Sequence, residues 1–280
     1  MEKPPLTCRV AGHEIAYHSA GEGETVLLVH GITTYSFIWR RIVPLLKARY
    51  RVISVDLLGC GASDKPLDLS YSIRQHATLL KGFADALELG AFHFVGHDVG
   101  GGIGQIFAVR YPEAITDLTL INTVAHDFWP VQPIIAMRTP IIRQLAMATL
   151  DVGALRLVVR RGLYYKDRLT GDLLDRFWAP MRTRSGRKGF LHFADSLNNR
   201  HLIEIEDDLK HLSVPVLIIR GDADVYLSGA IAEKLHRDIP DNRLFRIATG
   251  SHYIQEDEPD MLAEEMMRFW APSGSPLYET

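Results

Sequence analysis

Residues 96–100, which read Gly-His-Asp-Val-Gly, place a carboxylate at the centre of a glycine-flanked turn. A strand-to-helix turn of the Gly-x-X-x-Gly pattern displays its central side chain above the sheet, and that side chain is usually a serine. The central residue here is Asp98. A carboxylate can attack a saturated carbon and form an ester with it, so the stretch predicts nucleophilic chemistry on an alkyl carbon. The structural alternative is that Asp98 caps the start of the following helix.

Three further loops carry polar residues directly after apolar runs, and the first of them begins with His30-Gly31. His252 follows the last run, and either Asp222 or Asp224 follows the run before it. A histidine that is oriented by a carboxylate can serve as a base. The backbone N–H groups of Ile32 and Val99 can together form an oxyanion hole that stabilises a negative oxygen. Other polar residues of these loops are interpreted as structural: His30, Asp56 and His97.

The apolar runs alternate with segments of helical pattern. Near-continuous hydrophobicity is typical of strands that are buried on both faces, and the alternation predicts a mostly parallel sheet flanked by helices. The predicted strands lie within residues 24–31, 50–59, 91–98, 117–123, 214–222 and 243–249. An antiparallel edge hairpin is predicted from the alternating polarity of residues 6–12 and 13–21. Helices are predicted within residues 39–50, 72–89 and 103–113.

The alternation stops after Asn122 and resumes at about residue 213. The residues between are helical in pattern and include many aromatic and arginine side chains. We therefore predict a core domain of residues 1–123 and 213–280, interrupted by a helical cap of residues 124–212. Because ligands bind at the carboxyl edge of open α/β sheets, we expect the cap to cover that edge.

The order of these loops resembles the α/β-hydrolase fold over nearly the whole chain. The matching features are the His30-Gly31 pair, the strand-to-helix turn around Asp98 (called the elbow from here on), a cap before the acid, and a histidine after the last strand. Because its elbow carries an aspartate, the chain is similar to haloalkane dehalogenases, haloacetate dehalogenases and epoxide hydrolases. Residues 30–46 and 56–66 resemble the dehalogenases most.

The resemblance implies a role for each of five residues. Asp98 would be the nucleophile, His252 the base and Asp224 its orienting acid, with the acid two residues earlier as the alternative. The backbone of Ile32 and Val99 would form the oxyanion hole. In this mechanism the nucleophile forms an alkyl ester, and water activated by the histidine then attacks the ester carbonyl.

The residues around the elbow depart from the dehalogenase pattern. Haloalkane dehalogenases hold the leaving halide with a tryptophan directly after the nucleophile and often an asparagine directly after His-Gly. Val99 and Ile32 occupy these positions and have no side-chain donor. Haloacetate dehalogenases carry arginines just after the nucleophile, and residues 98–105 contain none. Trp129 and Trp178 of the cap are the candidates to replace the missing donors.

Epoxide hydrolases need an acid in the cap, usually two tyrosines on separate helices. The candidates here are Tyr164 and Tyr165, which are adjacent and therefore point about 100° apart on a helix. One tyrosine aided by His201 or His192 would serve the same purpose. Thr33 replaces the proline that the family carries two residues after His-Gly. We favour an epoxide-hydrolase-like activity, with carbon–halogen hydrolysis as the first alternative and non-hydrolytic catalysis or small-ligand binding as the second.

Composition narrows the class of protein. The chain is 47% hydrophobic and 23% charged, with a net charge of −3, which argues against a bulk nucleic-acid binder. The chain has only two cysteines, which argues against a disulfide framework, and its first residues lack a signal-peptide pattern. We expect a cytoplasmic monomer or homodimer that acts on a small-molecule substrate. We expect no cofactor, no metal, and neither nucleic acid nor membrane as a partner.

Overall fold

The computed structural model describes residues 4–128, 134–135 and 153–271. Eight strands form one sheet in the order β1-β2-β4-β3-β5-β6-β7-β8. The β1–β2 and β2–β4 pairs are antiparallel, and every other neighbouring pair is parallel. The strands are β1 Leu6–Val10, β2 His13–Ala20, β3 Glu24–Val29, β4 Tyr50–Val55, β5 Phe92–His97, β6 Ile115–Ile121, β7 Val216–Gly221 and β8 Asn242–Ile247. The predicted parallel sheet and its edge hairpin are confirmed.

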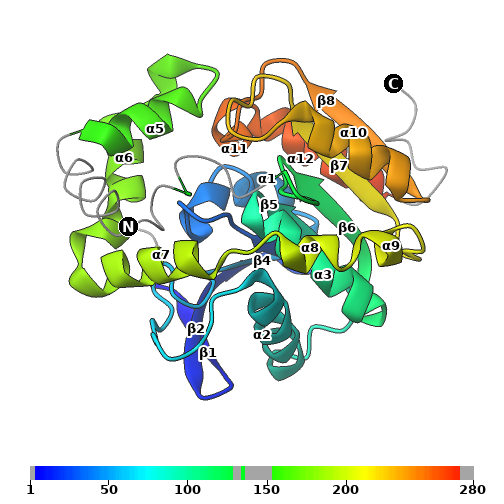
Figure 1. Cartoon of the computed structure of the whole chain (residues 1–280), viewed down its shortest axis with the longest axis horizontal. Helices are drawn as coiled ribbons and strands as arrows, with labels where there is room; N and C mark the ends of the chain where they lie inside the picture. Colours follow the sequence, from blue (N-terminus) through cyan, green and yellow to red (C-terminus); the bar gives the residue numbers. More distant parts are fainter. Residues whose placement is uncertain (1–3, 129–133, 136–152, 272–280) are drawn as a thin grey trace.

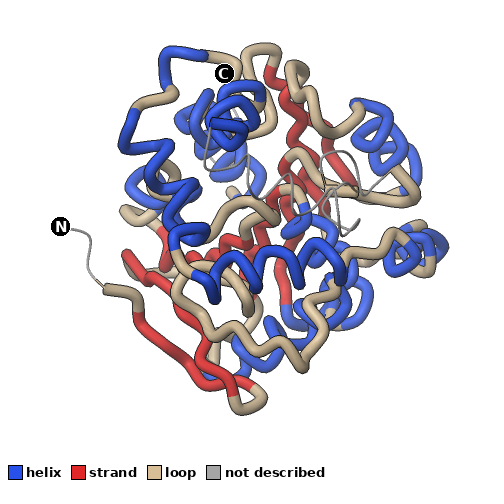
Figure 2. The backbone as a smooth tube through the Cα atoms, turned by 60° about the vertical axis from the view of Figure 1, so that its left-hand side comes forward, coloured by secondary structure: helices blue, strands red, loops and turns tan. Residues whose placement is uncertain are grey.

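Helices lie on both sides of the sheet, as the red strands between blue helices in Figure 2 show. The helices and 3-10 turns that belong to the core are η1 Ser36–Trp39, α1 Val43–Leu46, α2 Ile73–Ala86, α3 Val99–Arg110, η2 Pro112–Ala114, α10 Gly229–Asp238, α11 Ile254–Asp257 and α12 Pro259–Trp270. Those between β6 and β7 are α5 Leu155–Arg161, η5 Lys166–Arg168, α6 Gly171–Trp178, η6 Ala179–Arg182, α7 Arg184–Ser196, α8 Arg200–Ile203 and α9 Glu206–Leu209. None of the helices in the described ranges combines the length and the apolar character that a bilayer-spanning segment needs.

Side chains of successive strand residues enter two separate hydrophobic cores. On β3, Leu27 and Val29 join the core under α2, α3 and α10, whereas Val26 and Leu28 join the core that contains residues of η1, α1 and α12. All four side chains have no exposed surface. Both faces of β3 are therefore buried, which is why its sequence is continuously apolar rather than alternating.

Between β6 and β7, the described residues contain helices and turns but no strand. Figure 1 shows α5, α6 and α7 as an arc on one side of the molecule, while α8 and α9 return the chain toward β7. We use the name cap for residues 124–212.

Two predicted helices differ in extent from the observed ones. The segment 39–50 contains only the short helix α1, which begins at Val43, because Pro44 has no N–H and fits only the first turn of a helix. Helix α3 begins at Val99, four residues before the predicted start, and ends at Arg110. Its first turns are glycine-rich, and helix propensity alone does not indicate a helix there.

Candidate active site

Asp98 lies at a sharp turn between β5 and α3. Its backbone has φ 53° and ψ −120°, a conformation that costs energy for a residue with a side chain. The turn also requires glycine nearby, since a Cβ atom at Gly96 would lie 2.4 Å from the carbonyl oxygen of Gly100. The sequence pattern predicted this elbow, and the structure has it.

The carboxylate of Asp98 does not cap its own helix. Asp98 occupies the position before α3, but its side chain accepts no capping hydrogen bond. Its Oδ2 instead accepts a hydrogen bond from the backbone N–H of Ile32 at 3.1 Å. The structural alternative of a helix cap is therefore wrong. Gly31 is needed for this approach, because a Cβ atom there would lie 2.4 Å from the same oxygen.

His252 and Asp224 form the second part of the site. The Nδ1 atom of His252 lies 3.1 Å from Oδ2 of Asp224, and both residues are buried. The other oxygen of Asp224 accepts the N–H of Tyr226 at 2.8 Å, which fixes the carboxylate. Asp222, the alternative acid, accepts hydrogen bonds from Arg246, with Nε at 2.9 Å. The structure thus brings Asp224, rather than Asp222, to the histidine.

The buried charges shift one another's protonation. Burial raises the pKa of Asp98, and the opposing effects of His252 and the N–H groups of Val99 and Ile32 do not cancel it. Burial alone would lower the pKa of His252, but Asp224 and then Asp98 outweigh burial and raise it. The pKa of Asp224 is lowered although burial opposes this, because His252 and Arg220 stabilise its charge. The imidazole is therefore a strengthened base held between two carboxylates.

Arg220 is a site residue that sequence reasoning missed. It is 5% exposed, and its guanidinium donates to Asp224 Oδ2 at 3.4 Å and to the Leu227 carbonyl at 2.8 Å. The available signal was an arginine at the end of an otherwise apolar buried strand, β7. Its charge opposes the rise in the pKa of His252 while it stabilises ionised Asp224.

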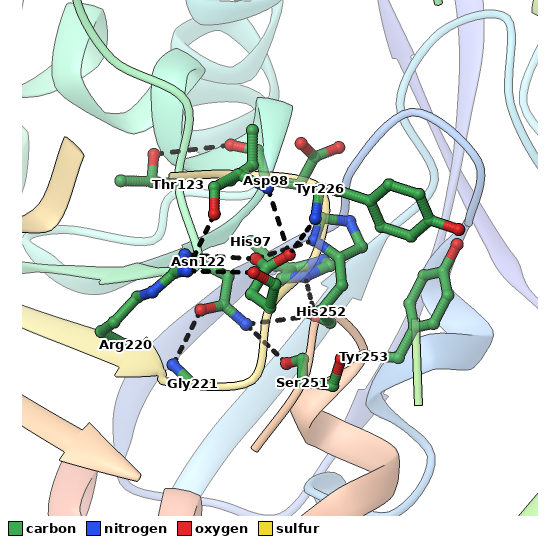
Figure 3. A network of polar contacts seen from close by, with 12 residues as sticks. His97, Asp98, Asn122, Thr123, Arg220, Gly221, Tyr226, Ser251, His252 and Tyr253 are labelled. Carbon is green, nitrogen blue, oxygen red and sulfur yellow. Dashed lines mark hydrogen bonds and ion pairs between the residues drawn. The ribbon is translucent and has the colours of Figure 1, made fainter. Parts of the chain in front are cut away.

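Two side chains, Asn122 and His97, form hydrogen bonds with backbone carbonyls of the loop that carries His252 (Figure 3). Asn122 donates from Nδ2 to the carbonyl of Ser251 at 2.8 Å and accepts the N–H of Gly221 at 2.9 Å. His97 donates from Nε2 to the carbonyl of His252 at 2.9 Å. Burial lowers the pKa of His97 to about 3, so this histidine is neutral and its role is structural, as predicted.

The other two residues predicted to shape loops also do so. His30 donates from Nδ1 to the Gly31 carbonyl at 2.7 Å and accepts the N–H of Leu57 at 3.0 Å. Asp56 accepts the N–H of Ser36 at 2.8 Å and that of Ala62 at 2.7 Å. These hydrogen bonds fix the loop that contains Ile32 and thereby the position of its N–H group.

Among the described residues, the tryptophan and the tyrosines predicted as substrate-pocket residues of the cap do not gather around Asp98. Trp129 lies outside the described residues, and Trp178 packs partly buried against the core beside η1 and α12. Tyr164 is 42% exposed, and Tyr165 donates its hydroxyl to Glu258 at 3.0 Å. The hydrogen bonds of these two tyrosines go to Asp257 and Glu258, and their rings pack against each other rather than against Asp98.

The two predicted cap histidines lie on different cap helices. His201 lies on α8, where burial and the charges of Arg74 and Arg110 lower its pKa. His192 lies on α7 and donates from Nε2 to the carbonyl of Leu69 at 2.8 Å. His192 is therefore engaged away from the elbow, whereas the buried Nδ1 of His201 has no hydrogen-bond partner among the described residues.

Two tyrosines that the sequence did not single out flank His252. The rings of Tyr226 and Tyr253 pack edge-on against His252, with centroids at 5.2 and 5.0 Å (Figure 3). A small cavity opens next to the Ile32 backbone, between the core loops and the cap. It is lined by Ile32, Thr33, Cys60, Met181, Phe190 and Phe193, among others.

Known proteins resemble the chain over nearly its full length. A family model described as the alpha/beta hydrolase fold matches residues 24–259. The cis-3-alkyl-4-alkyloxetan-2-one decarboxylase of Shewanella oneidensis is 28% identical over 272 residues, which cover 92% of this chain and 85% of that protein. Haloalkane dehalogenase 2 of Mycobacterium tuberculosis is 29% identical over 264 residues, covering 89% and 88%. An alpha/beta hydrolase fold protein from Burkholderia ambifaria has a TM-score of 0.86 at 26% identity, covering 95% and 98%.

Proposed function

The chain belongs to the α/β hydrolase fold family, and from this premise we propose that Asp98 is the nucleophile of a hydrolase acting on a small, mostly apolar substrate. The observation that carries the proposal is that the carboxylate leaves its helix uncapped and binds the N–H of Ile32. When one oxygen of Asp98 forms an ester, the other becomes the carbonyl oxygen that the same N–H stabilises during hydrolysis.

Charge coupling in the site supports a two-step reaction. In the free enzyme, ionised Asp98 is one of the charges that raise the pKa of His252. Ester formation removes that negative charge, so the pKa of His252 falls at the moment when a neutral base is needed. Asp224 keeps the Nδ1 proton in place, which leaves Nε2 to take a proton from water.

A strained ring that contains oxygen is the substrate class that we favour, with an epoxide as its simplest member. One relative is named for an oxetan-2-one, which is a four-membered ring with an oxygen atom. The side chains of Val99 and Ile32 offer no donor to a departing halide. Ring strain, by contrast, assists the departure of an oxygen from a saturated carbon.

Two other reactions have a specific observation in their favour. Hydrolysis of a carbon–halogen bond is favoured by the relative named haloalkane dehalogenase 2. Non-hydrolytic ring opening is favoured by the word decarboxylase in the name of the Shewanella relative. Both reactions can begin at the same carboxylate.

Trapping the covalent intermediate tests the proposal. The His252→Gln enzyme should gain the mass of the whole epoxide, as a hydroxyhexyl ester, from 1,2-epoxyhexane, and the mass of one hexyl group from 1-bromohexane, because the second step lacks its base. Peptide mapping should place the adduct on Asp98, and the double variant with Asp98→Asn should stay unmodified. Diol or bromide release by the unmodified enzyme then separates the two hydrolytic reactions. No adduct from either probe would contradict the assignment of the nucleophile.

A further inference from the structure

Thr33 and Tyr253 bring two hydroxyl groups together next to the residues that the proposed function uses. Thr33 follows Ile32 and Tyr253 follows His252 in the chain, and their hydroxyl oxygens lie 3.2 Å apart. Tyr253 is 1% exposed. Burial is the main cause that raises the pKa of its phenol, and Asp98 contributes in the same direction, so the hydroxyl lies within electrostatic reach of the nucleophile.

Within the described ranges, one hydrogen-bond donor of the pair is not used. Two hydroxyls carry two protons, and a single hydrogen bond between them uses one. Among the described residues, neither the Thr33 nor the Tyr253 hydroxyl has another hydrogen-bond partner. One O–H of this partly buried pair thus lacks an acceptor in the part of the chain that the structure describes, and an unmade hydrogen bond is costly where water is excluded.

Tyr226 shows what a fully engaged hydroxyl looks like in the same surroundings. Its ring packs on His252 at nearly the same distance as that of Tyr253. Its hydroxyl, however, donates to the carbonyl of Val158 at 2.7 Å. Tyr226 therefore serves the packing of the cap and offers no donor to a ligand.

Thr33 of the pair borders a small cavity with a volume of about 20 Å³, which has room for about one water molecule. Thr33 lines the small cavity together with Ile32, whose N–H binds Asp98. The rest of its lining comes from residues 59–61 and from cap side chains such as Met181 and Phe193, so the cavity is largely apolar. A donor at the wall of an apolar cavity fixes the position of one polar atom of a ligand.

We propose that the Thr33–Tyr253 pair donates a hydrogen bond to the oxygen that leaves the substrate carbon when Asp98 attacks. This inference rests on the proposed function and narrows its substrate class to strained rings whose leaving atom is oxygen. A new bond forms between Asp98 and the carbon while the ring C–O bond breaks. The electron pair stays on the ring oxygen, which takes a proton from the pair. Hydrolysis of the ester then consumes one water and releases one proton, which restores the pair.

The chemistry of the leaving atom provides a test that a purely structural role would not pass. An alkoxide is strongly basic and needs a proton or a strong donor, whereas bromide leaves without one. The rate of ester formation on the His252→Gln background should therefore respond to Tyr253 for 1,2-epoxyhexane and not for 1-bromohexane. This rate is measured by quenching at short times and determining the mass of the protein.

We expect Tyr253→Phe to slow ester formation from the epoxide by about 100-fold or more, as for loss of a catalytic donor. Ester formation from the bromide should change by less than about 3-fold, since only one hydroxyl is removed. Thr33→Val should reduce the epoxide rate by about 10-fold, within the range for a hydrogen bond of about 1.4 kcal/mol. Tyr226→Phe is the matched control and should affect both probes equally.

The outcomes separate this inference from the proposed function. Equal losses with both probes, or no loss with the epoxide, would overturn the role of the pair while leaving Asp98 as the nucleophile. An adduct from the bromide but none from the epoxide would also overturn it. No adduct from either probe before Tyr253 is changed would overturn the proposed function, and the inference with it.

Discussion

At the scale of single residues, Asp98 and His252 set each other's protonation because both are buried and near one another. Ionised Asp98 raises the pKa of His252, and the imidazolium opposes the rise in the pKa of Asp98. The carboxylate is a nucleophile only when ionised, and its pKa lies above its ordinary value. The acid limb of the pH–rate profile should therefore lie at a higher pH than an ordinary aspartate, with a pKa of about 3.9, would give.

Removing the charge of Asp98 should lower the pKa of His252. In Asp98→Asn the carboxylate that favours the imidazolium is gone, while Asp224 remains. The imidazole resonances of His252, followed by NMR across a pH titration, should show a lower midpoint than in the unmodified protein. A midpoint that stays the same or rises would contradict the coupling between the two residues.

Asp224 and Asp222 form a matched pair for testing the acid. Asp224→Asn should reduce kcat by about 100-fold or more, because the imidazole loses the partner that fixes its tautomer. Asp222→Asn, which breaks only the contacts with the half-exposed Arg246, should stay within about 2-fold, since such surface pairs contribute about 1 kcal/mol or less. Steady-state rates on the same substrate decide between them, and similar losses in both variants would count against the assignment.

At the scale of elements, the elbow depends on close contact between β5, α3 and the strand beside them. Gly100 lies in the first turn of α3, and a Cβ atom there would lie 2.4 Å from the carbonyl oxygen of Val29 in β3. The backbone of Gly100 and the backbone of β3 cannot move apart without disturbing the sheet. The glycines after Asp98 are therefore required by packing, although they weaken the helix itself.

Gly100→Ala should consequently lower the free energy of unfolding by about 1–3 kcal/mol or more, the usual cost of overpacking. The control is Gly229→Ala at the start of α10, where a Cβ atom would meet nothing within 4 Å. That change should leave stability unchanged or raise it by about 0.5 kcal/mol. Urea denaturation followed by circular dichroism measures both, and a tolerated alanine at residue 100 would show that the elbow is looser than described.

Local patterns predicted most of the elements, because strands buried on both faces and a glycine-framed turn can be recognised from a few consecutive residues. Each of the eight strands overlaps a segment that was read as a strand, although β6 begins two residues and β8 one residue before the predicted segment. The errors concern helices whose limits are set by tertiary contacts. Helix α3 starts at Val99 because its glycines pack against β3, and the segment 39–50 is mostly not helical because of Pro44.

At the scale of the whole molecule, Asp257 connects the cap to the loop that carries His252. Its carboxylate accepts the N–H groups of Tyr164 at 2.9 Å and Tyr165 at 3.2 Å from the cap, and that of Ser251 at 3.0 Å. Asp257 has no exposed surface. The position of His252 is thus coupled to the docking of the cap through one buried side chain.

Asp257→Ala should destabilise the protein by about 2 kcal/mol or more, since each buried N–H left unpaired costs about 1–3 kcal/mol. It should also lower kcat, because Ser251 precedes the base. Asp208→Ala, an exposed acid on α9, is the control and should change stability by less than about 0.5 kcal/mol. Thermal unfolding gives the comparison, and equal stability of the two variants would rule out the coupling.

The site was predictable only where its residues belong to local motifs. Asp98, Asp224 and His252 each lie in a recognisable loop or turn that follows a strand, so their order along the chain indicated them. The Thr33–Tyr253 contact joins residues 220 positions apart, and Arg220 is read from sequence as part of a strand. Such partners are chosen by the folded arrangement of the loops, which no short pattern encodes.

The central claim, that Asp98 forms a covalent ester, is tested most directly by one turnover in ¹⁸O-water with enzyme in excess over 1,2-epoxyhexane. Water attacks the carbonyl carbon of the ester, so the first product should carry an unlabelled oxygen from Asp98. The peptide containing Asp98 should in turn gain one ¹⁸O atom. A labelled diol together with an unlabelled Asp98 would mean that water attacks the substrate directly, and would contradict the account.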